Sequence, residues 1–342
     1  MNLIERVVPF TAGDGMALNL IHVRSADRAA TKGPVLLVHG AGVRANIFRA
    51  PTQQNIVEAL VAEGYDVWLE NWRASIDVPR NPWTLDQAAL FDHPQAVRKV
   101  LQETGASSLK ALIHCQGSTS FMMSLVAGLL PQVSVVVSNA VSLHPVIPAV
   151  SKWKITLATP LVGLFTKYLN PYWGIEPEGL FSRLLVSTIK LTHHECDNIV
   201  CRGSSFAYGV GFPVMWSHEN LGERVHEWLK DEFKNVPIRF FRQMTCCVHK
   251  GHLVAAESLP GLPQDFVALP PKTDAAIHFF AGEDNICFLP QSQINTYNYF
   301  LTHSSNKHSL TLIPGYGHLD VFMGMNASRD VFPKMLQALA SN

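Results

Sequence analysis

SLKALIHCQGSTSFMMSLVAGLLP, residues 108–131, is an apolar strand that passes directly into a helix. We expect the strand to end at Cys115 and the helix to run from Gln116 until Pro131 stops it. In a strand–turn–helix of this kind the central side chain is forced out at the top of the sheet, beside the helix N-terminus, and Gly117 lets the turn close. The Cys115 thiol is therefore placed as a nucleophile, although the stretch also fits a buried cysteine that packs as a small apolar residue.

Strands and helices alternate on both sides of this stretch. Continuous apolar runs bounded by glycine are typical of parallel strands that are buried on both faces. Short connections from strand to helix to strand predict a doubly wound, mostly parallel sheet, and therefore an α/β fold. After two short β segments at 4–10 and 17–23, the expected strands cover 35–38, 65–71, 108–115, 133–141, 275–282 and 308–315, and the expected helices cover 53–63, 83–105, 116–131, 290–302 and 328–341.

The alternation stops in the middle of the chain. Residues 145–270 hold many prolines, aromatic residues and helix-like pieces, and few strand-like runs. A chain of 342 residues is long for one compact core, which fits a large domain with an insertion. We expect an α/β core formed by residues 1–144 and 271–342, with residues 145–270 inserted as a helical cap.

Two turns near the C-terminus carry a carboxylate and an imidazole. AGEDN (281–285) ends one expected strand, and PGYGHLD (314–320) follows the next. Nucleophile, acid and histidine follow one another in this order in hydrolases of this topology. His318 would take the thiol proton, and Asp284 would hold the ring and stabilise the imidazolium. Because the strand end could shift by one residue, two neighbours remain alternatives for the acid: Glu283 and Asn285.

A glycine-containing loop, HGAG (39–42), follows the buried strand at 35–38. A His-Gly loop after this strand offers a backbone N–H to a developing oxyanion. We expect the N–H groups of Ala41 and Gln116 to form this oxyanion hole. The residues that could support the site are His39, Gly40, Gly117 and Ser118. Ser118 could donate to the site or serve only to satisfy the start of the helix.

Four segments, HGAG, YDVWLENWRAS, IHCQGSTS and PGYGHLDVF, together resemble the acid lipases of the α/β-hydrolase fold, the gastric and lysosomal type. Those enzymes have an HG-type oxyanion loop, a strand reading DVWLxNxRG and a GHSQGT elbow. The resemblance covers most of the expected core and, more weakly, the cap. It implies Cys115 as nucleophile, Asp284 as acid and His318 as base. It also implies hydrolysis of bulky, water-insoluble esters in a cleft under the cap.

The chain departs from this family pattern at several positions. The nucleophilic serine is replaced by Cys115, and the glycine two residues earlier by Ile113, whose branched side chain is expected to crowd Gly117 across the elbow. The two remaining departures are Arg73-Ala74 in place of Arg-Gly, and Val321 placed before Phe322 in the His-Leu-Asp-Phe motif.

A cysteine nucleophile leaves three functions open. A thiolate attacks acyl carbons well and forms a thioester, which water can hydrolyse to release the acid. The same thioester could pass its acyl group to an alcohol, since cysteine elbows of this kind also resemble those of polyhydroxyalkanoate synthases and dienelactone hydrolases. The third interpretation is a catalytically silent lipid-binding protein that keeps the fold and an apolar pocket.

Composition limits the partners. The formal net charge is 0 and basic runs are missing, which argues against nucleic acid as a partner. No cofactor is predicted. The sequence begins without a secretory pattern, so we expect a cytoplasmic protein with reduced thiols. Oligomeric state is not predicted.

The expected cap carries two groups of cysteines and histidines. Their spacing matches no common zinc module, so we predict no metal site and keep a disulfide and reduced thiols as alternatives. The groups are His193, His194, Cys196 and Cys201, and Cys246, Cys247, His249 and His252. The cap is also rich in aromatic residues, which suits an apolar substrate. Its most apolar segment, 155–165, could contact a membrane or lipid droplet at its periphery.

Overall fold

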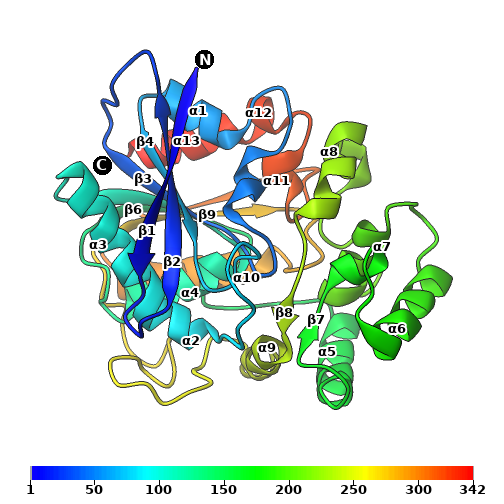
Figure 1. The fold of residues 1–342 in the computed structure, drawn as a ribbon. Coiled ribbons are helices and arrows are strands. Elements are labelled where there is room, and N and C mark those ends of the chain that lie inside the picture. The colour runs from blue at the N-terminus through cyan, green and yellow to red at the C-terminus, as the bar shows by residue number, and fades with distance from the viewer. Residues whose placement is uncertain (1, 342) are drawn as a thin grey trace.

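An eight-stranded sheet runs through residues 2–341, the part of the chain that the computed structural model describes (Figure 1). The strand order is β1-β2-β4-β3-β5-β6-β9-β10. β2 pairs antiparallel with β1 and β4, while the other neighbours in the sheet are parallel. The predicted doubly wound, mostly parallel sheet is therefore confirmed. The strands are β1 (Leu3–Thr11), β2 (Ala17–Ser25), β3 (Pro34–Val38), β4 (Asp66–Asn71), β5 (Leu109–His114), β6 (Val133–Asn139), β9 (Ala276–Gly282) and β10 (Ser309–Ile313).

The central strands are buried along nearly their whole length, as their apolar runs predict. Every residue of β3 is buried, and β5 and β6 are buried except at Lys110 and Ser134. Helices on both faces exclude water from these strands. The carboxyl ends of β3, β5, β9 and β10 meet at one edge of the sheet, where ligands bind in open α/β folds.

The core helices form two layers on either side of the sheet (Figure 1). α1 and α13 contact each other on one face, and α3, α4 and α10 pack on the other. A capping box between Asn55 and Glu58 fixes the start of α1. The core helices are α1 (Ile56–Ala62), α2 (Leu85–Gln87), α3 (His93–Thr104), α4 (Cys115–Val126), α10 (Gln291–His303), α11 (Asp320–Met323), α12 (Ala327–Asp330) and α13 (Phe332–Ala340), with a 3₁₀ turn η1 (Ala45–Arg49).

The helix expected over 83–105 forms in three pieces: α2, a π-helical turn η2 (Ala88–Asp92), and α3. Pro94 lies in the first turn of α3, where its missing N–H costs nothing. Asp92, at the end of the π turn, accepts from the Arg73 backbone N–H and binds its guanidinium in the interior. The buried ion pair thus occupies the junction that interrupts the regular helix.

The chain between β6 and β9 is mainly helical and forms the right side of the view in Figure 1, from α8 above to α5 below, before its last, yellow part crosses to the lower left. α5 packs on α9, and the N-terminal part of α9 lies against the core, where Phe240 contacts Trp83. We keep residues 145–270 as the proposed limits of the cap. Its elements are α5 (Ala149–Val162), β7 (Tyr168–Leu169), η3 (Pro171–Gly174), α6 (Gly179–Thr192), α7 (Ile199–Tyr208), η4 (His218–Asn220), α8 (Glu223–Trp228), η5 (Leu229–Asp231), β8 (Val236–Pro237) and α9 (Ile238–Lys250). Over residues 2–341, the helices are too short or too polar to cross a bilayer.

Candidate active site

The turn from β5 to α4 holds Cys115 in a left-handed backbone conformation. Its φ is 55°, which is uncommon for a residue other than glycine and marks a strained turn. Gly117 is required here, because a Cβ at this position would lie 2.2 Å from the His39 carbonyl oxygen. The predicted crowding by Ile113 is not seen: Ile113 is buried in β5, and the atoms nearest to that Cβ belong to Val38 and His39.

Replacing Gly117 by alanine is expected to open the elbow. The added Cβ would meet backbone oxygens that cannot move aside cheaply, so we expect a loss of about 2–3 kcal/mol in the free energy of unfolding and a larger loss of any activity. Chemical denaturation would measure the loss in the free energy of unfolding. Gly222→Ala is the matched control, because a Cβ there meets Met325 at an ordinary 3.5 Å. Equal stability of the two variants would contradict the tight elbow.

The Cys115 sulfur faces the two backbone N–H groups that the sequence suggested as an oxyanion hole. Hydrogen bonds from Gln116 and Ala41 to the sulfur lower the pKa of the thiol, but burial outweighs them and raises it to about 12. The thiol is therefore protonated at pH 7 in the resting protein. It needs a base to react.

His318 lies next to this thiol. The Cys115 sulfur and ring nitrogens of His318 and His114 all lie within 4.8 Å of one another. His318 is fully buried, and burial lowers its pKa to about 3, so the ring is neutral at pH 7. Its Nε2 has no hydrogen-bond partner within residues 2–341. This nitrogen is the one available to the thiol.

Asn285 holds the other side of the ring. Its Nδ2 lies 3.1 Å from His318 Nδ1, and its Oδ1 accepts from the backbone N–H groups of Cys287 and Phe288, each at 3.0 Å. Those two donors fix which end of the amide is oxygen. The amide NH₂ therefore donates to His318 Nδ1, and the neutral ring carries its proton on Nε2, toward Cys115.

This contact differs from the expectation for Asp284. Asp284 and Glu283 are both exposed, whereas Asn285 is buried and turned inward by the bend after β9, where its N–H bonds to Gly282. The residue that touches the histidine is Asn285, one position after Asp284 and one of the two alternatives, and it carries an amide in place of a carboxylate. An amide cannot accept the Nδ1 proton while its oxygen is held by two backbone donors.

The residues proposed as support have structural partners. His39 Nδ1 lies 2.7 Å from the Gly40 carbonyl oxygen, and the His39 carbonyl accepts from the Trp72 indole at 2.9 Å, which fixes the loop. Gly40 leaves room for the thiol, since a Cβ there would lie 3.1 Å from the Cys115 sulfur. Ser118 bonds to Ser138 at 2.8 Å inside the core. It therefore serves the packing of α4 on β6.

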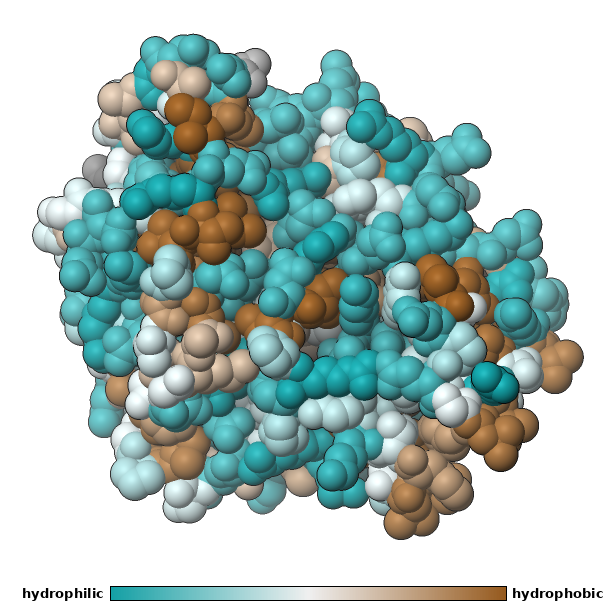
Figure 2. All heavy atoms as spheres, viewed as in Figure 1, coloured by the Kyte–Doolittle hydropathy of each residue, from teal (hydrophilic) through white to brown (hydrophobic). Residues whose placement is uncertain are grey.

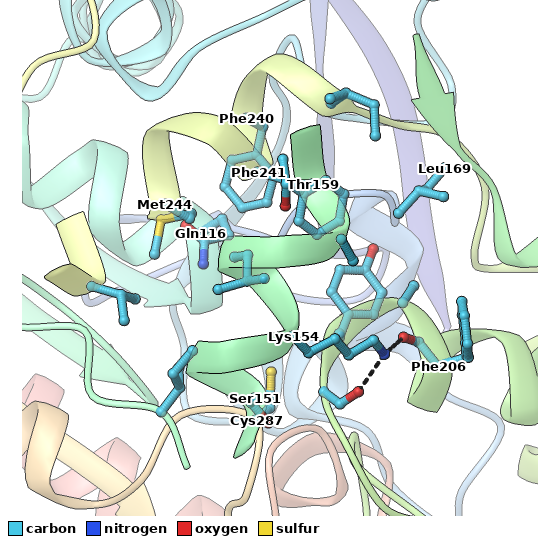
Figure 3. Close-up of a pocket in the computed structure, with 18 of the residues that line it drawn as sticks. Gln116, Ser151, Lys154, Thr159, Leu169, Phe206, Phe240, Phe241, Met244 and Cys287 are labelled. Atoms are coloured by element: carbon cyan, nitrogen blue, oxygen red, sulfur yellow. Dashed lines mark hydrogen bonds between the residues drawn. The ribbon is translucent and has the colours of Figure 1, made fainter. Parts of the chain in front are cut away.

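An apolar cavity opens above Cys115, between α5, α7 and α9 (Figure 3). Its volume is about 120 Å³. Cavities of this kind, with few polar groups, bind apolar ligands. The residues that line the cavity are Cys115, Gln116, Ile147, Ser151, Lys154, Ile155, Ala158, Thr159, Val162, Leu169, Phe206, Ala207, Tyr208, Gly209, Ile238, Phe240, Phe241, Met244, Val248, Cys287 and Phe288.

Lys154 is the charged residue of this lining. Its Nζ donates to the carbonyl oxygens of Phe206 and Gly209, as the dashed lines in Figure 3 show, and the second distance is 2.7 Å. Burial lowers its pKa to about 8. Sequence reasoning missed Lys154, His114 and Cys287. A lysine within the mostly apolar helix α5 was a signal for Lys154. His114 and Cys287 become neighbours of the site only in the folded chain.

Between residues 2 and 341, two groups of side chains have donor atoms close enough to hold a metal. One is the active-site group of His114, Cys115 and His318. The other lies in the cap and consists of Cys196, Cys201, His218 and His226. The sequence predicted neither.

Comparison with known proteins gives distant relatives along nearly the whole chain, and no protein-family model matches it. Human "Lipase member K" is 22% identical over 357 aligned positions, covering 95% of this chain and 85% of that protein. "Sterol esterase 2" of Saccharomyces cerevisiae is 28% identical over 131 positions, 34% of this chain and 24% of its own.

Solved structures share the fold at low identity. A soluble variant of monoglyceride lipase from Saccharomyces cerevisiae, in complex with a substrate analog, has a TM-score of 0.62 at 17% identity, covering 97% of this chain and 95% of that one. DcsB in complex with its substrate analogue has a TM-score of 0.60 at 14% identity, covering 98% and 99%. These neighbours confirm the predicted fold.

Proposed function

We propose that this chain, a lipase-like protein of the α/β-hydrolase fold, cleaves apolar carboxylic esters or thioesters through an acyl-enzyme on Cys115. The observation that carries the proposal is the placement of the Cys115 sulfur at the base of the apolar cavity, with the Ala41 and Gln116 N–H groups turned toward it. The same two donors would stabilise the oxyanion that forms when the sulfur attacks a carbonyl carbon. The distant lipase and esterase relatives support ester hydrolysis as the reaction class.

The proposed reaction has two halves. His318 Nε2 takes the thiol proton, the sulfur–carbon bond forms, and the bond to the alcohol or thiol breaks as that leaving group takes the proton from His318. Water then attacks the thioester, gives its proton to His318, and the acid leaves as the thiol is re-formed. Both halves need an unprotonated Nε2.

Asn285 raises the free energy of the His318 ring with an unprotonated Nε2. The tautomer with a free Nε2 carries its proton on Nδ1, where it would meet the Asn285 NH₂ group. Rotation of the amide would relieve this clash but would break the bonds from Cys287 and Phe288 to its oxygen. Each such loss in a buried site costs about 1–3 kcal/mol. We therefore propose a slow hydrolase, in which Asn285 takes the place of the acid.

The same observation favours a second candidate function. A thiol with its pKa raised to about 12 and a histidine held in the unreactive tautomer suit a protein that binds an apolar acyl ligand without turning it over. The cavity would then be a carrier or sensor site. The wild-type reaction with an ester distinguishes the two functions.

The outer surface of the cap supports access to lipid. α5 lines the cavity with Ile155 and Val162 and exposes large apolar side chains on its other side. These belong to an apolar area at the lower right of Figure 2, over α5 and α6. We propose that it contacts a membrane or lipid-droplet surface. Its members are Val150, Trp153, Leu157, Leu161, Leu164, Phe165, Leu180, Leu184 and Leu191.

Intact-mass measurement tests the proposed function. Wild-type protein incubated with p-nitrophenyl esters of several chain lengths should gain the mass of one acyl group and lose it again in water. Cys115→Ala should gain none, and Cys287→Ala is the matched control, because Cys287 is also a buried thiol in the cavity wall and its loss should leave the adduct. An adduct that persists until an alcohol is added would indicate acyl transfer. Tight binding of a fatty acid without any adduct would support the second function and overturn the first.

A further inference from the structure

The cap brings together two cysteines and two histidines that play no part in the proposed reaction. Cys196 follows α6, Cys201 lies in the first turn of α7, His218 in η4 and His226 in α8. One donor atom from each of the four lies within 4.8 Å of every other. We infer that Cys196, Cys201, His218 and His226 form a structural zinc site.

The distances fit a tetrahedral ion. Cys201 Sγ lies 3.2 Å from His218 Nε2, and Cys196 Sγ lies 3.4 Å from His226 Nε2. Zinc–sulfur bonds of about 2.3 Å and zinc–nitrogen bonds of about 2.0–2.1 Å at a tetrahedral angle separate sulfur from nitrogen by about 3.6 Å. The side chains therefore need only small movements to coordinate an ion. Two thiolates also balance the charge of Zn²⁺, so the part-buried site requires no further counter-ion.

The surroundings orient the ligands as outer partners of metal sites do. The Asn198 backbone N–H donates to Cys196 Sγ at 3.3 Å, and its side-chain amide donates to the His226 carbonyl at 2.6 Å. The buried indole N–H of Trp216 has no hydrogen-bond partner within residues 2–341. N–H donors to sulfur stabilise a thiolate. Closed sets of two cysteines and two histidines are characteristic of structural zinc.

The site would tie the cap to the loop that carries His318. His218 adjoins Ser217 and lies two residues before Asn220, both of which donate to the Asp320 carboxylate. That carboxylate also accepts from the Gly317 N–H at 2.9 Å, next to the proposed base. Zinc at His218 would therefore fix this segment. We expect its removal to lower the melting temperature by several degrees.

Elemental analysis of full-length protein tests the inference. Protein purified with a phosphine reductant and passed over a chelating resin should hold one zinc per chain. Cys201→Ser and His218→Ala should each lose it. Cys246→Ser, at an exposed cysteine outside the site, should keep it. Cys115→Ser should also keep it, which distinguishes this site from the active-site group of His114, Cys115 and His318.

A cobalt spectrum of the wild-type protein tests the site even if these variants fail to fold. Wild-type protein exchanged with Co²⁺ should show the intense visible bands of tetrahedral cobalt and thiolate-to-cobalt charge transfer. Wild-type protein without stoichiometric zinc and without these bands would overturn the site. So would zinc that survives Cys201→Ser, or a disulfide that peptide mapping places between Cys196 and Cys201.

Discussion

Replacing Asn285 by aspartate is expected to raise kcat/KM for ester hydrolysis by about 10²- to 10⁴-fold. The carboxylate is nearly the same shape as the amide, so one oxygen keeps the N–H groups of Cys287 and Phe288 and the other accepts the Nδ1 proton of His318. The ring then presents an unprotonated Nε2 to Cys115. Steady-state kinetics with a p-nitrophenyl ester measures the gain.

The pH profile separates this role from a structural one. A base works only when unprotonated, so activity falls as pH drops through its pKa. Burial holds the pKa of His318 at about 3 in the wild-type protein, so no acid limb is expected above about pH 4. A neighbouring carboxylate favours the imidazolium and raises this pKa, so Asn285→Asp should move the acid limb to higher pH.

Asp284→Asn is the matched control for this prediction. Asp284 is the exposed neighbour of Asn285 and the acid that the sequence suggested. If Asn285 is the partner of His318, the control should keep the wild-type rate. A control that loses all activity, together with Asn285→Asp that gains none, would return the role to Asp284 and contradict the geometry described above.

Most of the fold follows from local patterns in the sequence. The continuous apolar runs that form β3, β5 and β6 predict buried parallel strands. The direct passage from strand to helix at Cys115 predicts the elbow. The expected helices at 83–105 and 328–341 form in pieces, and at 83–105 the ion pair of Arg73 and Asp92 lies at a π turn. Such a pair joins residues far apart in the sequence, so no local pattern shows it.

The site was harder to predict for a related reason. Glu283, Asp284 and Asn285 are all common in turns, and only the path of the chain after Gly282 decides which of them points inward. The tautomer of His318 depends on which backbone N–H groups hold the Asn285 oxygen. The four proposed zinc ligands belong to separate elements of the cap, and their spacing resembles no compact zinc motif.

Replacing Cys115 by serine is expected to abolish hydrolysis in the wild-type background, with a loss of at least about 10³-fold in kcat/KM. A hydroxyl is a far weaker acid than a thiol, so it depends more strongly on an unprotonated Nε2 at His318. Cys287→Ser, a thiol-to-hydroxyl change elsewhere in the cavity wall, should keep most of the activity. It controls for the added polarity.

The double variant Cys115→Ser with Asn285→Asp should then recover hydrolysis, because it restores a complete serine–histidine–aspartate arrangement on the same elbow. We expect Asn285→Asp to have a larger effect in the serine background than in the cysteine background, and a double-mutant cycle measures the difference. Equal effects in both backgrounds would mean that the gain from Asn285→Asp does not depend on the nucleophile at position 115. Serine and aspartate would then contribute independently, and the slow step would lie elsewhere. Strong coupling would instead show that Asn285 limits this site by fixing one proton on the His318 ring.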